Sequence, residues 1–178
     1  MKAITSLAIV VLMTTFYSCN TSTTITTTDN ATVDSMRYFV DETYKGFANG
    51  DFTVFDRMTS PGLVDHGMGD KDVVGKDSVK ASLKEMTAQI RGIKFDILSE
   101  SADSNYTMAL VRITGTSASP ITGFPVGASI DMKNVDVLRW KDGKVTEHWE
   151  YADPRDMMKM MASMPTPPAP KVDSAVHK

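Results

Sequence analysis

The stretch GASIDMKNVDVLRWKDGKVTEHWEYADP, residues 127–154, decides the fold of this chain. Apolar and polar residues alternate on both sides of Asp142-Gly143, as they do in half-buried strands. Asp-Gly between two such runs is a strong hairpin signal, because both positions of the two-residue turn need positive φ. Pro154 ends the second run, since proline cannot donate to a strand ladder. We therefore predict a β-hairpin that uses nearly the whole stretch.

Upstream of the hairpin, the spacing of apolar residues changes from helical to alternating. It predicts three helices, at about 33–47, 52–58 and 77–90, and four strands, at 93–101, 107–117, 127–140 and 144–152. A short closing helix is expected after Pro154, with its methionines packed on the body of the domain. Helices followed by antiparallel strands indicate an α+β domain, in which a curved antiparallel sheet wraps around the N-terminal helices and leaves a pocket between them.

Both ends of the chain are expected to lie outside this domain. Residues 1–18 have the short positive start and apolar segment of a signal peptide. Residues 19–31 are polar and Thr-rich, which predicts a flexible tether, and residues 165–178 are Pro-rich, which predicts a disordered tail. The globular domain is therefore expected at 32–164.

Cys19 is the only cysteine of the chain and directly follows the apolar segment. A small residue followed by such a cysteine resembles the lipobox of bacterial lipoproteins, where the chain is cut before the cysteine and lipid is attached to it. The resemblance implies lipidation at Cys19 and a membrane anchor in the bacterial cell envelope, on the periplasmic or outer-membrane face. The alternative is an ordinary signal peptide with Cys19 as a spare thiol.

Composition narrows the class of protein. The 178 residues are 42% hydrophobic and 23% charged, which is typical of one soluble globular domain. The formal net charge is −3, so no basic field is available to hold a nucleic acid.

The two faces of the hairpin differ in character if alternation continues without a break. A two-residue turn pairs Trp140 with Val145. One face then carries Trp140, Leu138, Trp149, Tyr151 and Met132, with Asp136, Glu147 and Asp153 among them. The other face carries Val135, Val137, Arg139, Thr146, His148 and Glu150, a mixed set that suits solvent or a partner subunit and leaves a homodimer open.

Three carboxylates on an apolar face indicate a pocket wall. Burying an unpaired carboxylate is costly, so its pKa rises until it carries a proton part of the time. A raised pKa would let Asp153 or Glu147 transfer protons near neutral pH. The alternative is that Asp136 and Glu147 lie at the rim and that Asp153 only ends the strand.

Two segments carry a family resemblance. Residues 123–158, GFPVGASIDMKNVDVLRWKDGKVTEHWEYADPRDMM, and residues 44–67, YKGFANGDFTVFDRMTSPGLVDHG, resemble SnoaL-like polyketide cyclases and predicted ester cyclases. These families belong to the nuclear-transport-factor-two-like superfamily. The resemblance covers nearly the whole domain and implies the cone-shaped α+β fold, also called cystatin-like.

The resemblance also implies roles for particular residues. In cyclases of this family, an acidic residue on the last strand is the acid/base of an intramolecular aldol closure, which here points to Asp153. His148, His66 and Asp65 are implied as polar residues of the catalytic pocket. Trp149 is implied as a packing surface for a flat ligand, and the remaining expected ligand-binding residues are Glu147, Tyr151, Asp136, Trp140 and Tyr44. No metal or organic cofactor is implied.

One conflict stays open at this point. Alternation puts His148 on the face opposite Trp149 and Asp153, whereas the resemblance places it in the pocket. A β-bulge would reverse the alternation, and bulges are common beside active sites.

Two functions therefore compete. The first is a cofactor-independent cyclase, isomerase or ester cyclase that uses carboxylate acid/base chemistry on a small apolar or aromatic molecule. The second is a non-catalytic module for small-ligand binding or dimerisation, because this fold is used widely without chemistry.

Overall fold

The computed structural model describes residues 30–67, 70–119 and 124–163. The expected signal peptide, Cys19, most of the tether and the Pro-rich tail lie outside the described residues. The elements are α1 (Asn30–Asn49), α2 (Thr53–Met58), β1 (Thr59–Asp65), β2 (Val73–Val74), α3 (Lys76–Ala88), β3 (Ile90–Ala102), β4 (Tyr106–Ser117), β5 (Ser129–Lys141), β6 (Lys144–Ala152) and α4 (Pro154–Ser163).

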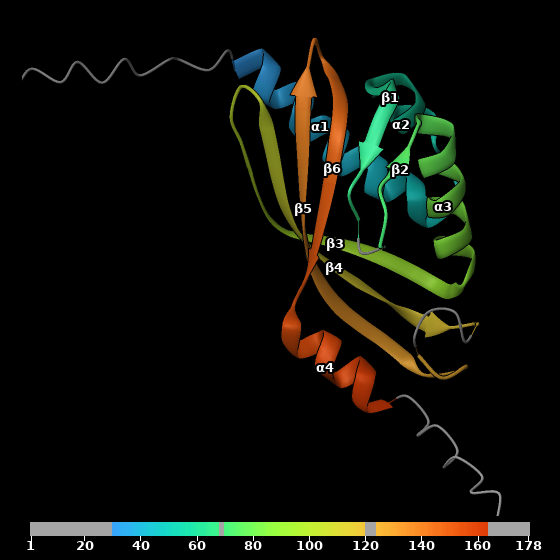
Figure 1. The fold of residues 1–178 in the computed structure, drawn as a ribbon. Coiled ribbons are helices and arrows are strands. Elements are labelled where there is room, and N and C mark those ends of the chain that lie inside the picture. Colours follow the sequence, from blue (N-terminus) through green and yellow to red (C-terminus); the bar gives the residue numbers. More distant parts are fainter. Residues whose placement is uncertain (1–29, 68–69, 120–123, 164–178) are drawn as a thin grey trace, which may run out of the picture.

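The six strands form one curved, unclosed sheet in the order β2-β1-β6-β5-β4-β3. The β1–β6 pair is parallel and the other four neighbouring pairs are antiparallel. Helices α1, α2 and α3 lie together against the sheet, whereas α4 lies beyond the end of β6 (Figure 1). The expected α+β class, with a curved sheet around N-terminal helices, is confirmed.

The core forms between α1 and the sheet. Phe39 and Phe47 point from α1 into this core, where Phe39 meets the edge of Trp140 at 5.2 Å between ring centroids. The indole nitrogen of Trp140 donates to Thr107 Oγ1 at 2.8 Å, so its polar atom is satisfied inside the core. An edge-to-face aromatic pair of this kind is a directional contact between α1 and the sheet.

One element boundary differs from the sequence expectation. Ile90 begins β3 instead of ending the third helix, because α3 stops at Ala88. Pro61 lies within β1. The register between β1 and β6 shifts between Thr59 and Val64, so the proline falls where the ladder is interrupted.

The predicted hairpin turn is confirmed, and a β-bulge follows it. Asp142 and Gly143 have φ of 52° and 71°, and Trp140 lies opposite Val145. Arg139 then lies opposite Glu147, so Thr146 is an extra residue in β6. From Glu147 onward, each side chain of β6 points to the face opposite to the one that uninterrupted alternation predicts.

No helix within the three described ranges is long and apolar enough to cross a membrane.

Candidate active site

The bulge determines which side chains of the hairpin face the helices. Leu138 is paired with His148 and Asp136 is paired with Glu150, and all four line a cavity between the sheet and the helices. The outward orientation that alternation predicts for Glu150 is therefore wrong, and the conflict left open for His148 is resolved in favour of the cavity. The physical reason is the single extra residue at Thr146, which reverses the alternation of β6 but leaves that of β5 unchanged.

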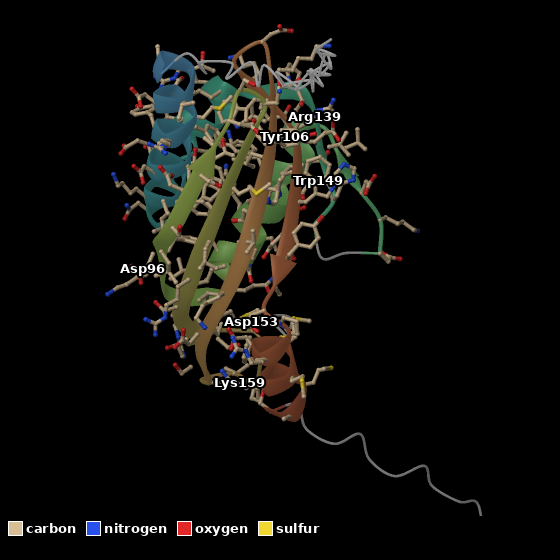
Figure 2. The ribbon with its side chains drawn as sticks, turned by 90° about the vertical axis from the view of Figure 1, so that its left-hand side faces the viewer. Asp96, Tyr106, Arg139, Trp149, Asp153 and Lys159 are labelled. Atoms are coloured by element: carbon tan, nitrogen blue, oxygen red, sulfur yellow. The ribbon has the colours of Figure 1, made fainter. Side chains whose placement is uncertain are left out.

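Trp149, Tyr151 and Glu147 lie on the outer face of the sheet, which corrects the prediction that they line the pocket. Tyr151 is 58% exposed, and Glu147 Oε1 accepts a hydrogen bond from Arg139 Nη1 at 2.6 Å. Figure 2 looks onto this outer face, with Trp149 and Arg139 at the near surface. These three side chains are therefore separated from the cavity by the sheet itself.

Asp153 lies where β6 meets α4, away from the cavity (Figure 2). Its Oδ1 accepts from the backbone N–H of Arg155 at 2.9 Å, as a helix-capping carboxylate does. Hydrogen bonds from the side chain and backbone of Arg155 lower the pKa of Asp153. The expectation of a raised pKa is therefore wrong, because the carboxylate is hydrogen-bonded to Arg155 instead of lying unpaired in an apolar face.

The cavity has a volume of about 80 Å³. Its walls combine hydrophobic side chains of α1, α2, α3 and β1 with a small polar group on the sheet. The lining includes Phe39, Val40, Phe47, Phe55, Leu63 and Val79, together with Thr43, Tyr44, Asn134, Asp136, His148 and Glu150. A cavity of this size has room for a small cluster of waters or a small organic fragment.

His148 is held between two carboxylates. Its Nδ1 donates to Asp65 Oδ1 at 3.0 Å, and its Nε2 lies 3.8 Å from Asp136 Oδ1. Burial disfavours the charged ring, but the hydrogen bonding and negative charge of Asp136 and Asp65 outweigh burial and raise the pKa of His148 to about 10. The imidazole ring is therefore protonated at neutral pH, with both nitrogens as donors.

Asp136 is positioned by α1. The hydroxyl of Tyr44 donates to Asp136 Oδ2, which fixes the carboxylate plane. The other oxygen, Oδ1, is buried and makes no hydrogen bond of normal length among the described residues, with His148 Nε2 3.8 Å away. Since an unsatisfied buried carboxylate oxygen is costly, this atom is where a ligand or water would be bound most favourably.

Glu150 is a second acid on the same wall. Asn134 Nδ2 donates to Glu150 Oε1, and Asn134 is itself almost fully buried. Burial, together with the negative charge of Asp136, raises the pKa of Glu150 to about 7. Glu150 therefore exchanges a proton in the pH range where a catalytic acid/base is most effective.

Of the other predicted site residues, the structure brings Tyr44, Asp65, Asp136 and His148 together and places two elsewhere. His66 stacks on Trp149 on the outer face, with ring centroids 4.9 Å apart, and its Nδ1 lies 2.9 Å from Asp72 Oδ1. Trp140 is in the core and does not line the cavity.

Sequence reasoning missed Glu150 and Asn134 as site residues. Glu150 is two positions from His148 on one strand, so any argument that turned His148 inward would have turned Glu150 inward too. Asn134 carries no comparable signal, because a polar residue in a strand is equally compatible with the outer face.

In the part of the chain that the structure describes, no group of three or more His, Cys, Asp or Glu side chains is arranged to hold a metal ion.

Comparison with known proteins identifies the domain. Residues 36–161 match the family described as SnoaL-like polyketide cyclase. Among curated proteins, no relative matches the sequence.

Solved structures have the same fold at low sequence identity. A protein described as a SnoaL-like polyketide cyclase, from Jannaschia sp. CCS1, is 16% identical with a TM-score of 0.64 over 75% of this chain and 95% of its own. AclR from Streptomyces galilaeus, described as a hydroxylase, is 19% identical with a TM-score of 0.62 over 75% and 99%. An epoxide hydrolase from M. tuberculosis is 19% identical with a TM-score of 0.58 over 73% and 91%. At these identities the likeness shows the fold and not the reaction.

Proposed function

We propose, on the premise that this chain belongs to the SnoaL-like polyketide cyclase family, that it is a cofactor-independent acid/base enzyme acting on a small carbonyl compound. The reaction class is removal of a proton next to a carbonyl group, followed by isomerisation or ring closure. The single observation that carries the proposal is an acid and a base 3.8 Å apart in one cavity, namely His148 Nε2–H and Asp136 Oδ1.

Each of these two groups is held by a third residue. Asp65 accepts from His148 Nδ1, which fixes the ring so that Nε2–H is directed toward Asp136. Tyr44 binds Asp136 Oδ2, which leaves Oδ1 as the basic atom. Geometry held by such supporting hydrogen bonds is what general acid/base catalysis requires.

Asp136 and Glu150 account for every proton that moves in this reaction. Asp136 Oδ1 takes a proton from the carbon next to the substrate carbonyl, and the electron pair moves onto the carbonyl oxygen. His148 Nε2–H donates a hydrogen bond to that oxygen and stabilises its negative charge in a site of low dielectric. In isomerisation of an unsaturated ketone, Asp136 returns this proton to the far carbon of the conjugated enolate. In ring closure, the enolate carbon attacks a second carbonyl of the same molecule, the new alkoxide oxygen takes a proton from Glu150, and the proton held by Asp136 restores Glu150.

The test is hydrogen–deuterium exchange of cyclohexanone and pentan-2-one in D₂O, followed by NMR at the carbon next to the carbonyl. We expect Asp136→Asn and His148→Gln each to slow exchange by roughly a hundredfold or more. Asp153→Asn is the matched control and should leave exchange unchanged, because that carboxylate lies outside the cavity. Thermal unfolding of each variant checks that the fold is retained.

Two results would overturn the assignment. Normal exchange in Asp136→Asn excludes this carboxylate as the base. Binding of the ketones without any exchange by the unmodified protein assigns the chain to the alternative function, a non-catalytic small-ligand-binding module.

We also propose that the domain is exported and anchored by lipid at Cys19. The support is the sequence pattern of residues 1–19, and the membrane would then be a partner of the protein in the cell envelope.

A further inference from the structure

A second, larger hollow lies next to α4 and shares part of its wall with the inner cavity. This outer groove has a volume of about 610 Å³ and is lined by residues of α3, the sheet and α4. Four residues line both spaces, namely Met86, Ile113, Asn134 and Glu150. The two hollows are therefore adjacent compartments that meet at the Asn134–Glu150 pair.

Strand β5 forms part of the wall of both compartments. Its inward-facing residues are Asp136 in the inner cavity, Asn134 at the junction, and Met132 and Ile130 in the outer groove. Asp136 and Met132 are four residue steps apart along the extended strand, which corresponds to about 13 Å. A molecule longer than this can touch both the reactive carboxylate and the groove.

The chemistry of the wall changes along this path. Both compartments are mainly apolar, but the inner one carries the acid/base group Asp136 and His148 on its sheet wall. The groove carries neither of these, and its apolar wall is formed by Met132, Ile130, Phe124 and the two α4 residues Met157 and Met160, with Ser82, Glu85 and Gln89 as polar neighbours. Methionine side chains are flexible and polarisable, so a methionine wall adapts to apolar ligands of different shape.

Helix α4 is fixed in place as one side of the groove. Asp156 is buried at its first turn, accepts from the backbone N–H of Lys133 at 3.2 Å, and lies 3.5 Å from Lys133 Nζ. With α4 attached in this way, Met157 and Met160 are half-buried toward the groove, whereas Met158 and Met161 are 64% and 58% exposed. The expectation that all these methionines pack on the domain is therefore wrong for Met158 and Met161.

We propose that the outer groove holds the apolar tail of the molecule whose carbonyl head reacts in the inner cavity. The substrate class is then an elongated amphiphile, about 13 Å or longer, with an enolisable carbonyl at one end and a hydrocarbon or aromatic tail. This inference rests on the proposed function for the head group. It adds that tail length, and not the head alone, determines affinity.

The test is the affinity of the full chain for a series of methyl ketones, from butan-2-one to dodecan-2-one, measured by calorimetry. Affinity should rise about fourfold for each methylene that enters the groove and then level off. In the double variant Met157→Gln/Met160→Gln, which keeps side-chain length but adds polar atoms, we expect the longest ketones to bind at least about tenfold more weakly. Butan-2-one should bind equally well to both proteins.

The exposed methionines of the same helix provide the matched control. Met158→Gln/Met161→Gln carries the same chemical change outside the groove and should bind the whole series like the unmodified protein. An affinity that is independent of tail length, or equal losses in the two double variants, would overturn the proposal.

The two proposals fail in different ways. Tail-dependent binding without deuterium exchange would leave the groove assignment standing and remove the catalytic function. Exchange of short ketones without tail dependence would do the reverse, and absence of binding across the series would contradict both.

Discussion

Asp65 and His148 lie side by side on the parallel strands β1 and β6, with Asp65 Oδ1 3.0 Å from His148 Nδ1. Both side chains are largely buried, at 15% and 19% exposure. The pair therefore joins two strands, and the negative charge of Asp65 helps to keep His148 protonated. The contribution of this pair to stability can be measured from the pH dependence of the free energy of unfolding.

The first prediction is that the free energy of unfolding falls as pH rises from about 6.5 to about 10. The pKa of His148 is raised from 6.5 to about 10 in the folded chain. The protonated ring therefore stabilises the folded state fully below pH 6.5, and this stabilisation is lost as pH rises through about 10. Each pKa unit corresponds to about 1.4 kcal/mol, which sets an upper bound of about 5 kcal/mol.

Urea unfolding at several pH values measures this effect. His148→Gln cannot titrate, so the stability advantage of the unmodified protein over this variant should shrink across the same range. A constant difference between the two proteins would show that His148 is not held in its charged form.

The second prediction is that Glu150→Gln stabilises the protein at pH 8 but not at pH 4. Burial raises the pKa of Glu150 to about 7 from 4.5, so the unfolded chain releases this proton at lower pH than the folded chain. The free energy of unfolding therefore falls by about 1 to 3 kcal/mol as pH rises from 4.5 to about 7. Glutamine keeps the oxygen that accepts from Asn134 and removes the charge.

Glu147→Gln is the control for this second change. Glu147 lies on the same strand but on the outer face, so its substitution should produce no comparable gain at pH 8. Equal gains in the two variants, measured by thermal or urea unfolding, would contradict the burial of Glu150.

The third prediction contrasts the two tryptophans. Trp140 is 5% exposed and packs on Phe39, so Trp140→Ala should lower the free energy of unfolding by about 3 to 5 kcal/mol. Trp149→Ala should cost clearly less, because that ring lies on the outer face against His66. Urea unfolding of both variants tests the register of the hairpin, and a larger loss for Trp149 would refute it.

The fourth prediction concerns the proposed lipid anchor. If Cys19 is acylated, the unmodified protein partitions into the detergent phase of a Triton X-114 extraction, whereas Cys19→Ser does not. Unchanged partitioning of the variant would rule out lipidation at this position.

Local sequence features were enough to predict most of the fold. The spacing of apolar residues located three helices and four long strands, and Asp142-Gly143 located the turn, because each of these signals acts over a few residues. The end of α3 was missed by two residues, since Ile90 continues the apolar spacing of the helix although it begins a strand.

The site could be predicted only in part, for a reason that lies in Thr146. Alternation places Asp136 inward correctly, since β5 has no bulge before this residue. Beyond Thr146 the same rule turned Trp149 inward and His148 outward, because a one-residue shift exchanges the two faces of a strand. Threonine is an ordinary strand residue, so nothing in its chemistry marks the position of the bulge.

The place of β6 between β1 and β5 has a consequence for the order in which the domain assembles. Asp65 and His148 are 83 residues apart, so β1 has no long partner strand until the last strand of the sheet has been made. Contacts between such distant segments carry a high loop-closure entropy and slow folding. The helices and the β3–β4–β5 meander can form early from nearer contacts, whereas the pairing of His148 with Asp65 must await β6. The pairing that completes the sheet is therefore also the pairing that completes the candidate site.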